Sequence, residues 1–465
     1  MNRILFAFIF CCLCFSIHGH AQLYINGGSI YLDSGAAVNI KGDLLSAQSI
    51  AGSGKVIMNG TSGQNLNMGG NLIPGLEIDN SQNVTLASNL KIQNQLSFVN
   101  GKIVTGNNDV TLASNMTCNG MGAGKMIDVS GGGIVYKELE SNLINTEIPI
   151  GLYNAYNPVY ITTNATAYQN AKLGIRAVAI KYPELPVGST DYLKVYWPIT
   201  RTGITGNVSV TGQYNNVSDV TGSKTNLIGS FFDGNQWSTS GESHDASLNK
   251  VGMPITGTGG VLTGINNGGL VNIKALIQGY YMGGNAMQTT LHDLELNNIS
   301  NATDSISVAL WSPSGLNNVI PNYQFNTLMH QSGIATINVP AAGLGNTYYL
   351  ALKHRNTIET WSSNPLLMTN NLIYDFTTGA DKAYSDGVNP SMKQLADGKF
   401  AFYSGDVNQD GSIDVLDMLP AENDASAFAF GYNQTDCTGD AVTDLSDMIY
   451  IENNAGMFIF YSRPY

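Results

Sequence analysis

The sequence predicts a mainly β fold with an N-terminal β-solenoid-like region, two β-sandwich domains and a small α-helical module at the C-terminus. Three observations support this prediction. The 465 residues include 52 glycines, and only 12% are charged while 43% are hydrophobic, which is typical of folded β proteins with many turns rather than of disordered chains. Short strand-like segments recur along most of the chain, and an acidic loop occurs twice near its end.

The first 21 residues have the pattern of a secretory signal peptide. Met1–Arg3 carries a positive charge and precedes an apolar run from Ile4 to Ile17. Gly19-His-Ala21 then places small residues where signal peptidases cut, so we expect cleavage near Ala21 and Gln22. No later apolar run approaches the ~18 residues that a membrane span needs. The sequence therefore predicts a secreted or cell-surface protein with no membrane span in the mature chain.

Residues 22–130 consist of short strand-like segments separated by Gly, Asn and Ser. Leu23–Ile25 and Lys55–Met58 are examples, and the hexapeptide Val-Thr-Leu-Ala-Ser-Asn occurs at 84–89 and again at 110–115. Strands of this length at nearly regular spacing favour the stacked rungs of a β-solenoid. The same strands would also suit a β-sandwich, which stays open as the alternative.

Residues 131–270 contain longer strand-like segments. Phe231–Phe232 and Trp237 flank an Asp-Gly-Asn sequence that is typical of a hairpin turn. The stretch from Thr256 to Gly269 is rich in Gly, Thr and Asn and marks the end of the region. We predict a β-sandwich for this region.

Residues 271–404 are predicted to form a second sandwich. Ser305–Trp311 alternates between polar and apolar residues, as expected of a strand that is buried on one face. About seven short strands over ~130 residues fit an immunoglobulin-like sandwich. The last expected strand, Lys399–Tyr403, runs directly into Gly405 without a linker. We therefore expect the sandwich and the C-terminal module to act as one unit.

Residues 405–465 contain two acidic loops that lie thirty positions apart, at 406–417 and 436–447. Aspartates occupy positions 1, 5, 9 and 12 of both loops, and a twelve-residue loop with this spacing places oxygens around one calcium ion. Position 7 contributes a backbone carbonyl, so a valine is acceptable there. The predicted ligands are Asp406, Asn408, Asp410, Ser412, Asp414 and Asp417 in the first loop and Asp436, Thr438, Asp440, Val442, Asp444 and Asp447 in the second.

The two calcium sites are not expected to bind equally tightly. Position 6 of such a loop makes a sharp turn, and it holds Gly411 in the first loop but Ala441 in the second. A residue with a side chain in a left-handed conformation costs about 1–2 kcal/mol. We therefore predict that the first site is the tighter one.

The duplication extends beyond the loops into a short helix and an aromatic tail. Glu422-Asn423 returns as Glu452-Asn453, and Phe428 returns as Phe458. On these residues, 405–465 resembles a dockerin, a duplicated calcium-loop and helix module that binds a cohesin on a scaffold or cell surface. Aspartate at position 12 fits that family.

The resemblance to dockerins has departures at the positions that recognise the partner. Dockerins often carry Ser-Thr at loop positions 10 and 11 and basic residues in the helices. Here those loop positions hold Val415-Leu416 and Leu445-Ser446, and neither helix contains a basic residue. The resemblance implies calcium binding and a cohesin-like or other surface protein as partner, but the partner's identity stays open.

Charge is concentrated in the same C-terminal module. Residues 405–465 contain eleven Asp or Glu residues and a single base, Arg463, whereas the formal charge of the whole chain is −13. The rest of the chain is therefore nearly neutral and offers no basic stripe. This distribution argues against nucleic acid as a partner.

The sequence offers little support for catalysis. The four histidines of the mature chain show no metal-ligand spacing, and no hydrolase or phosphate-loop motif occurs. We predict a non-catalytic protein that uses its calcium-stabilised module for attachment or display. One alternative is a carbohydrate-binding component of extracellular polysaccharide breakdown, and a weaker one is a glycoside hydrolase with paired carboxylates. Lys353–Trp361 is either a ligand-binding loop with Trp361 as a stacking platform or, as we favour, a strand turn with Trp361 in the core.

Overall fold

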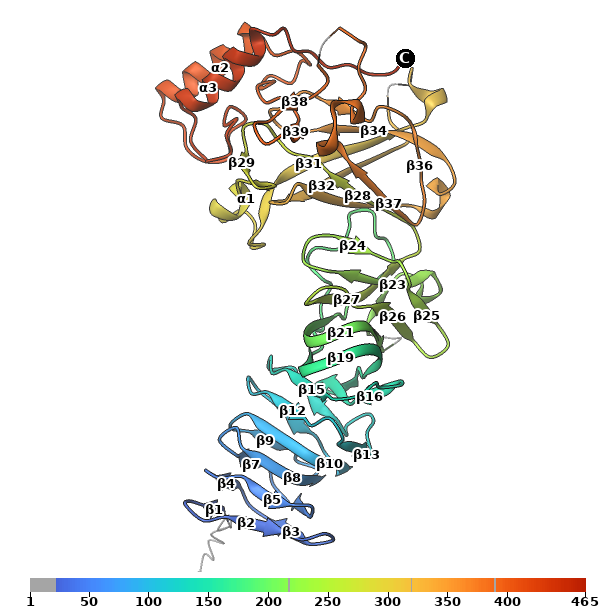
Figure 1. The fold of residues 1–465 in the computed structure, drawn as a ribbon, viewed down its shortest axis with the longest axis vertical. Coiled ribbons are helices and arrows are strands. Elements are labelled where there is room, and N and C mark those ends of the chain that lie inside the picture. The colour runs from blue at the N-terminus through green and yellow to red at the C-terminus, as the bar shows by residue number, and fades with distance from the viewer. Residues whose placement is uncertain (1–21, 216–217, 319, 389) are drawn as a thin grey trace, which may run out of the picture. The chain divides into compact units, whose positions relative to one another are not determined.

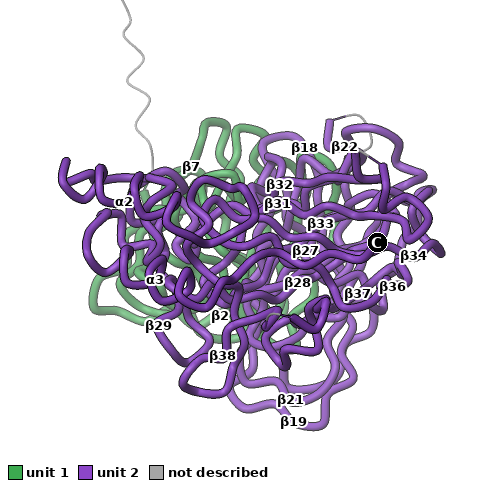
Figure 2. Tube along the Cα trace, turned by 90° about the horizontal axis from the view of Figure 1, so that it is seen from above, with its two compact units in different colours: residues 1–138 green, residues 139–465 purple. Residues whose placement is uncertain are grey.

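The computed structural model describes residues 22–465 except 216–217, 319 and 389, so the predicted signal peptide lies outside the described residues. The fold is mainly β (Figure 1). The described residues form two compact units, a first one that ends at residue 138 and a second one of residues 139–465 (Figure 2). Each unit is described separately below.

The first unit is a stack of short strands with a β-solenoid-like arrangement. Its strands are β1 (Leu23–Ile25), β2 (Ile30–Leu32), β3 (Ala37–Ile40), β4 (Leu44–Ser46), β5 (Ile50–Gly52), β6 (Lys55–Met58), β7 (Gln64–Asn67), β8 (Leu72–Asp79), β9 (Val84–Leu86), β10 (Leu90–Asn100), β11 (Ile103–Val104), β12 (Val110–Leu112), β13 (Thr117–Asn119), β14 (Ile127–Asp128) and most of β15 (Val135–Leu139). Strands of successive rungs pair in parallel, for example β4 with β7 and β7 with β9. Gln64 pairs with Val84, twenty residues later, which is the length of one rung.

Apolar side chains stack in register inside these rungs. Val56 pairs with Leu76, and Leu76 pairs with Leu96 on the next rung. All three side chains are buried. Such ladders bury the inward face of each three- or four-residue strand, which no single rung could do alone. The two copies of the hexapeptide lie in different ladders, because β9 pairs with β11 while β12 pairs with β10.

The second unit begins with long antiparallel strands. Its strands up to residue 274 are β16 (Thr146–Ile148), β17 (Ile150–Leu152), β18 (Ala155–Tyr156), β19 (Val159–Ile175), β20 (Tyr192–Leu193), β21 (Trp197–Gln213), β22 (Val220–Thr221), β23 (Leu227–Phe232), β24 (Trp237–Ser238), β25 (Ser243–Asp245), β26 (Lys250–Pro254), β27 (Gly259–Asn266) and β28 (Gly269–Lys274). Strands β19 and β21 pair antiparallel along most of their length. The predicted hairpin turn at 233–235 is confirmed, because Phe232 pairs with Trp237.

A further sheet has the strand order β35-β34-β31-β32-β33-β28-β37. The strands that follow β28 are β29 (Tyr281–Gly283), β30 (Ala286–Met287), β31 (Ala302–Trp311), β32 (Tyr323–His330), β33 (Ile334–Val339), β34 (Thr347–Lys353), β35 (Thr360–Trp361), β36 (Leu366–Leu367), β37 (Asn371–Asp375), β38 (Lys393–Gln394) and β39 (Phe400–Ala401). The alternation predicted for Ser305–Trp311 appears in β31, where every second side chain from Ile306 to Leu310 is buried. The strand expected at Lys399–Tyr403 is shorter, because only Phe400 and Ala401 are paired as a strand.

The α-helices of the described residues are few and lie mostly at the C-terminal end. The short helix α1 spans Thr290–Asp293, and α2 (Val415–Ser426) and α3 (Leu445–Ala455) each follow one acidic loop. Figure 1 shows α2 and α3 side by side, and the two helices are in contact. Ala421 and Ile451 are buried in a small core with Ile413 and Ile459. The two repeats therefore share one apolar core.

Candidate cation-binding loops

Both acidic loops end in the same capping arrangement at the start of a helix. The Asp414 carboxylate accepts the backbone N–H of Leu416, and Asp417 accepts the backbone N–H of Asp414 at 2.9 Å. Asp444 and Asp447 repeat this pattern at the start of α3. These reciprocal bonds satisfy amides that a helix start otherwise leaves unpaired. The aspartates at loop positions 9 and 12 thus have a structural role in addition to their predicted role as ligands.

The first loop holds a buried carboxylate that lacks a full set of partners. Asp406 is 2% exposed, and its Oδ1 atom has no hydrogen-bond partner among the described residues. Burial, together with the negative charges of Asp417 and Asp410, raises the pKa of Asp406 to about 7. A buried carboxylate is costly unless a cation or hydrogen-bond donors compensate its charge. This orphaned oxygen fits a cation bound inside the first loop.

Of the other predicted ligands of the first loop, Asn408 and Asp410 are exposed, Ser412 and Asp414 are half-buried, and Asp417 is buried. Asn408 accepts the backbone N–H of Asp410 at 2.8 Å, and Asp410 accepts that of Ser412 at 3.0 Å. The Asp417 carboxylate lies behind them and accepts N–H groups from Val407 and Asn408. Across the described residues, no three His, Cys, Asp or Glu side chains converge into a metal-binding group.

The second loop differs at its first position, because Asp436 has a complete set of partners. Its Oδ1 accepts the N–H of Gly439 at 2.7 Å, and its Oδ2 accepts that of Ala441 at 3.2 Å. The Arg355 guanidinium lies 3.3 Å from Oδ2. Burial raises the pKa of Asp436, and the charge of Arg355 opposes that rise. The guanidinium of Arg355 therefore already compensates part of the negative charge that calcium would neutralise in this loop.

The other predicted ligands of the second loop follow the pattern of the first. The N–H of Thr438 donates to Asp447, and the N–H of Val442 donates to the exposed Asp440 at 3.0 Å. Val442 also forms a β-bridge with Phe430. Burial raises the pKa of Asp447 to about 6.

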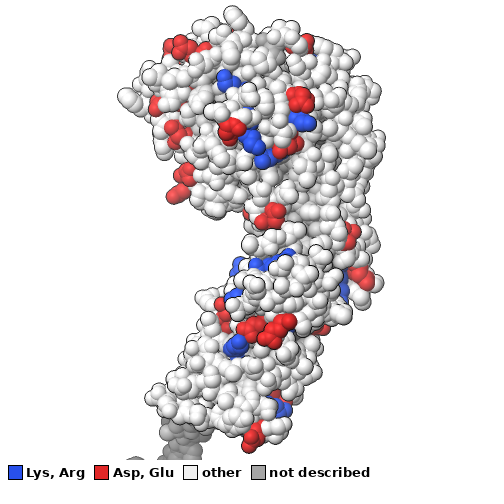
Figure 3. Space-filling view, viewed as in Figure 1, with Lys and Arg blue, Asp and Glu red and all other residues white. Residues whose placement is uncertain are grey.

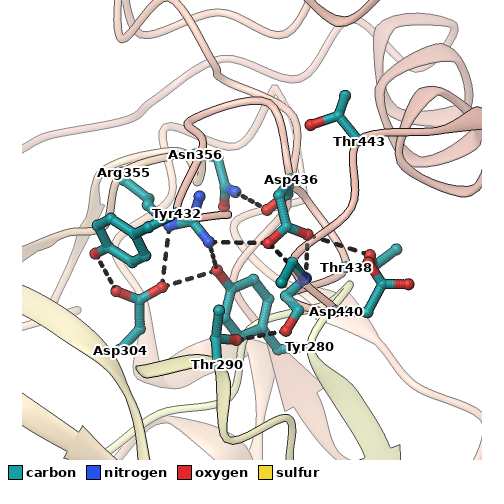
Figure 4. A network of polar contacts seen from close by, with 12 residues as sticks. Tyr280, Thr290, Asp304, Arg355, Asn356, Tyr432, Asp436, Thr438, Asp440 and Thr443 are labelled. Atoms are coloured by element: carbon teal, nitrogen blue, oxygen red, sulfur yellow. Dashed lines mark hydrogen bonds and ion pairs between the residues drawn. The ribbon is translucent and has the colours of Figure 1, made fainter. Parts of the chain in front are cut away.

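A buried polar network joins the second loop to the sheet (Figure 4). Asp304, on β31, is fully buried and accepts hydrogen bonds from Tyr280 at 2.8 Å, from Arg355 at 3.0 Å and from Tyr432. His354 lies 3.0 Å from the same carboxylate. Burial alone would raise the pKa of Asp304, but the neighbouring His354 and Arg355 hold it below its usual range.

Several neutral contacts reinforce this junction. Asn356 donates to the backbone carbonyl of Asp436 at 2.6 Å, and Thr290 donates to that of Gly439 at 2.5 Å. A Cβ atom at Gly439 would lie 2.7 Å from the Tyr280 ring, so only glycine allows this close approach. From α3, the buried Asn454 donates to Gln278 and to the carbonyl of Ser404. The acidic module is thus packed on the sheet rather than tethered to it.

The sequence did not reveal the residues of this network. The segment Lys353–Trp361 stood out for its charges, but the pairing of Arg355 with Asp304 and Asp436 joins residues that are far apart in the chain. Trp361 is 2% exposed and donates from Nε1 to Glu359 at 2.7 Å, which agrees with the favoured core position rather than with an open stacking platform. The signal in the sequence that could have indicated the network was the cluster of charged residues at Lys353–Trp361, in a chain with few charges.

The backbone at loop position 6 bears on the predicted order of affinity between the two loops. Ala441 has a φ of 69°, and Gly411 at the equivalent position has a φ of 91°. Together with Arg355 beside Asp436, this strain is expected to weaken the second site. Asp406→Ala should leave only a weak calcium site and Asp436→Ala a tight one, as measured by isothermal titration. Ala441→Gly should tighten the second site roughly tenfold. Two equal sites, or a stronger site in the Asp406→Ala protein, would contradict this order.

Comparisons with known proteins give no family for the chain. No family model matches it, and no curated protein is similar to it.

None of the helices in the described part of the chain is long and apolar enough to cross a membrane. On the face shown in Figure 3, Lys and Arg residues form small separate groups.

Proposed function

We propose that this chain is a non-catalytic, secreted or surface protein that attaches to another protein through a calcium-stabilised, dockerin-like module at residues 405–465. In this proposal the two loops bind calcium, and the sheets of residues 131–270 and 271–404 are immunoglobulin-like sandwiches that carry the module. The ion has a structural role: it neutralises the buried carboxylates and thereby fixes α2 and α3.

The observation that carries this proposal is the distribution of exposed apolar side chains. Among the residues that the structure describes, half of the exposed large hydrophobic side chains, 14 of 28, lie in the last 51 residues. They include Val415, Leu416, Leu419, Phe428, Phe430, Leu445, Ile449, Phe458 and Phe460. Concentrations of this kind mark surfaces that bind a partner.

The positions of these side chains agree with a docking role. Leu416 and Leu445 are 60% and 68% exposed, and they lie at loop positions 11 and 10. The adjacent aspartates at position 12, Asp417 and Asp447, are buried. The predicted contact residues therefore face solvent while two of the predicted ligands face inward. The network around Arg355 holds this surface rigidly on the sheet, which reduces the entropy that binding would cost.

The chemistry of the surface indicates the kind of partner. It combines exposed leucines and phenylalanines with a local excess of ten negative charges. A complementary surface would present an apolar patch surrounded by basic residues. We propose a cohesin-like or other cell-surface protein of that character.

Replacing Leu416 and Leu445 together by Asp is expected to abolish partner capture, because two buried charges would oppose an apolar contact. Calcium affinity should change little, since neither side chain is a predicted ligand. The measurement is a pull-down from a cell-surface fraction with the mature protein, with and without chelator, followed by direct binding of the purified partner. Leu367→Asp, at a leucine of the sheet that is 52% exposed, is the control.

Calcium-independent capture, or capture that survives the double substitution, would refute the docking surface. The non-catalytic part of the proposal has its own test. Turnover of any member of a panel of plant or host polysaccharides by the purified mature protein would show that it is wrong.

A further inference from the structure

A pocket of about 480 Å³ lies between the first acidic loop and the sheet. From the sheet it is lined by Trp311, Lys353 and Glu359, and from the C-terminal module by Asp406, Asp410 and Arg463, among others. This volume is within the range of small-ligand sites. Neither the calcium loops nor the docking surface proposed above accounts for such a pocket.

The pocket contains two positive charges that are available to a ligand. Lys353 and Arg463 form no salt bridge with any described residue, although the charge of Lys353 opposes the rise in the pKa of Asp406, whereas Arg355, two residues from Lys353, pairs with Asp304 and Asp436. Arg463 is also the only base of the acidic module. In a chain with so few charges, two basic side chains outside any salt bridge at one cavity favour an anionic group as ligand once the charge of the loop carboxylates in the cavity wall is neutralised.

Aromatic rings provide the second element of the pocket. Trp311 is half-buried, and its ring lies 5.7 Å from that of the buried Trp361. Tyr461 lines the pocket from the C-terminal module and is 37% exposed. Flat rings beside polar groups suit the apolar face of a sugar ring, while hydroxyls bond the polar groups. Glu359, which accepts from Trp361, offers its carboxylate to such hydroxyls.

The acidic wall of the pocket makes the binding of an anionic ligand depend on calcium in the first loop. Asp406 and Asp410 would repel an anion when the first loop is empty, and calcium in that loop would cancel their charge. Calcium coordinates six to eight oxygens, so oxygens of the bound anion would complete the set that the loop supplies. Loading the first loop thus converts a repulsive wall into an attractive one.

We propose that this pocket binds a uronate residue of an acidic polysaccharide, and that binding requires calcium in the first loop. The uronate carboxylate contacts Lys353 and Arg463, and its ring packs on Trp311. This inference rests on the calcium binding proposed above, but not on the docking surface, which shares only the edge residue Tyr461 with the pocket.

The test uses the mature full-length protein with digalacturonate as the probe and a neutral disaccharide and an acidic dipeptide as comparisons. Tryptophan fluorescence, with Trp311 at the site, gives the binding curve in calcium and in chelator. We expect saturable digalacturonate binding in calcium, at least tenfold weaker binding in chelator, and no binding of the neutral sugar. Lys353→Met and Arg463→Met should each weaken binding roughly tenfold or more, while Lys393→Met, outside the pocket, should not.

Calcium binding is titrated separately, so that the two proposals fail in different ways. If the chain binds no calcium, the calcium module and this site both fail. If calcium binds and digalacturonate does not, only this site is refuted. Equal binding of the dipeptide would show a general carboxylate site instead of a sugar site, and equal binding in chelator would refute the dependence on calcium.

Discussion

Removing calcium from the mature protein is expected to unfold α2 and α3 while the first unit keeps its structure. Without a cation, Asp406, Asp417 and Asp447 are buried carboxylates whose pKa values are raised by burial. An ion that binds only the folded state stabilises it by about 2.7 kcal/mol at a hundredfold excess over its dissociation constant. The calcium contribution is therefore a large fraction of the stability of so small a module.

Hydrogen exchange measured by mass spectrometry resolves this effect along the chain. In chelator, peptides from residues 405–465 should lose protection, and those from residues 22–138 should not. The isolated segment 401–465 should be largely unfolded in chelator and become helical on addition of calcium. Asp406→Ala should imitate chelator in part, whereas Asp381→Ala, at an exposed aspartate outside the loops, should have no effect. Identical exchange and circular dichroism in both conditions would contradict a calcium-dependent fold.

Local patterns in the sequence predicted local structure well. The near-regular spacing of strands in residues 22–130 indicated stacked rungs, and the parallel pairing of Gln64 with Val84 has that geometry. The alternation in Ser305–Trp311 predicted the buried side of β31. These patterns work because a strand has a fixed side-chain period of two and a rung has a nearly fixed length.

The roles of the loop aspartates were only partly predictable. Their spacing suggested metal ligands, but Asp414 and Asp444 also cap the helices. The Asp-x-x-Asp pattern at loop positions 9 to 12 is a sequence signature of such a cap. The difference between Asp406, with its orphaned oxygen, and Asp436, with Arg355 beside it, appears only in three dimensions. The repeat made the two loops look equivalent because the sequence does not show what packs against each of them.

The residues that join the module to the sheet could not be found from local patterns. Arg355 is 51 residues from Asp304 and 81 residues from Asp436. Such pairs are set by the packing of whole elements, and no periodicity within a segment records them. The pocket between Lys353 and Arg463 has the same origin, since one wall comes from residues 311–361 and the other from residues 406–463.

Asp304→Asn is expected to open the junction between the second loop and the sheet. The substitution keeps the shape of the side chain but removes the charge that Arg355, Tyr280 and Tyr432 surround. Breaking a buried ion pair by removing one partner typically costs 3–5 kcal/mol, because the other charge stays buried without compensation. Asp436 compensates Arg355 only in part, at 3.3 Å.

Hydrogen exchange of the peptide spanning residues 428–447 measures this opening, since local exchange reports the free energy of local unfolding. A loss of at least 3 kcal/mol corresponds to exchange more than roughly a hundredfold faster. Tyr432→Phe removes one hydrogen bond to the same carboxylate and should accelerate exchange only several-fold. Asp381→Asn breaks an exposed contact with Lys382 at 3.9 Å and should change nothing measurable. If Asp304→Asn behaved like Asp381→Asn, the network would not be what holds the acidic module on the sheet, and the rigid presentation of its apolar surface would need another cause.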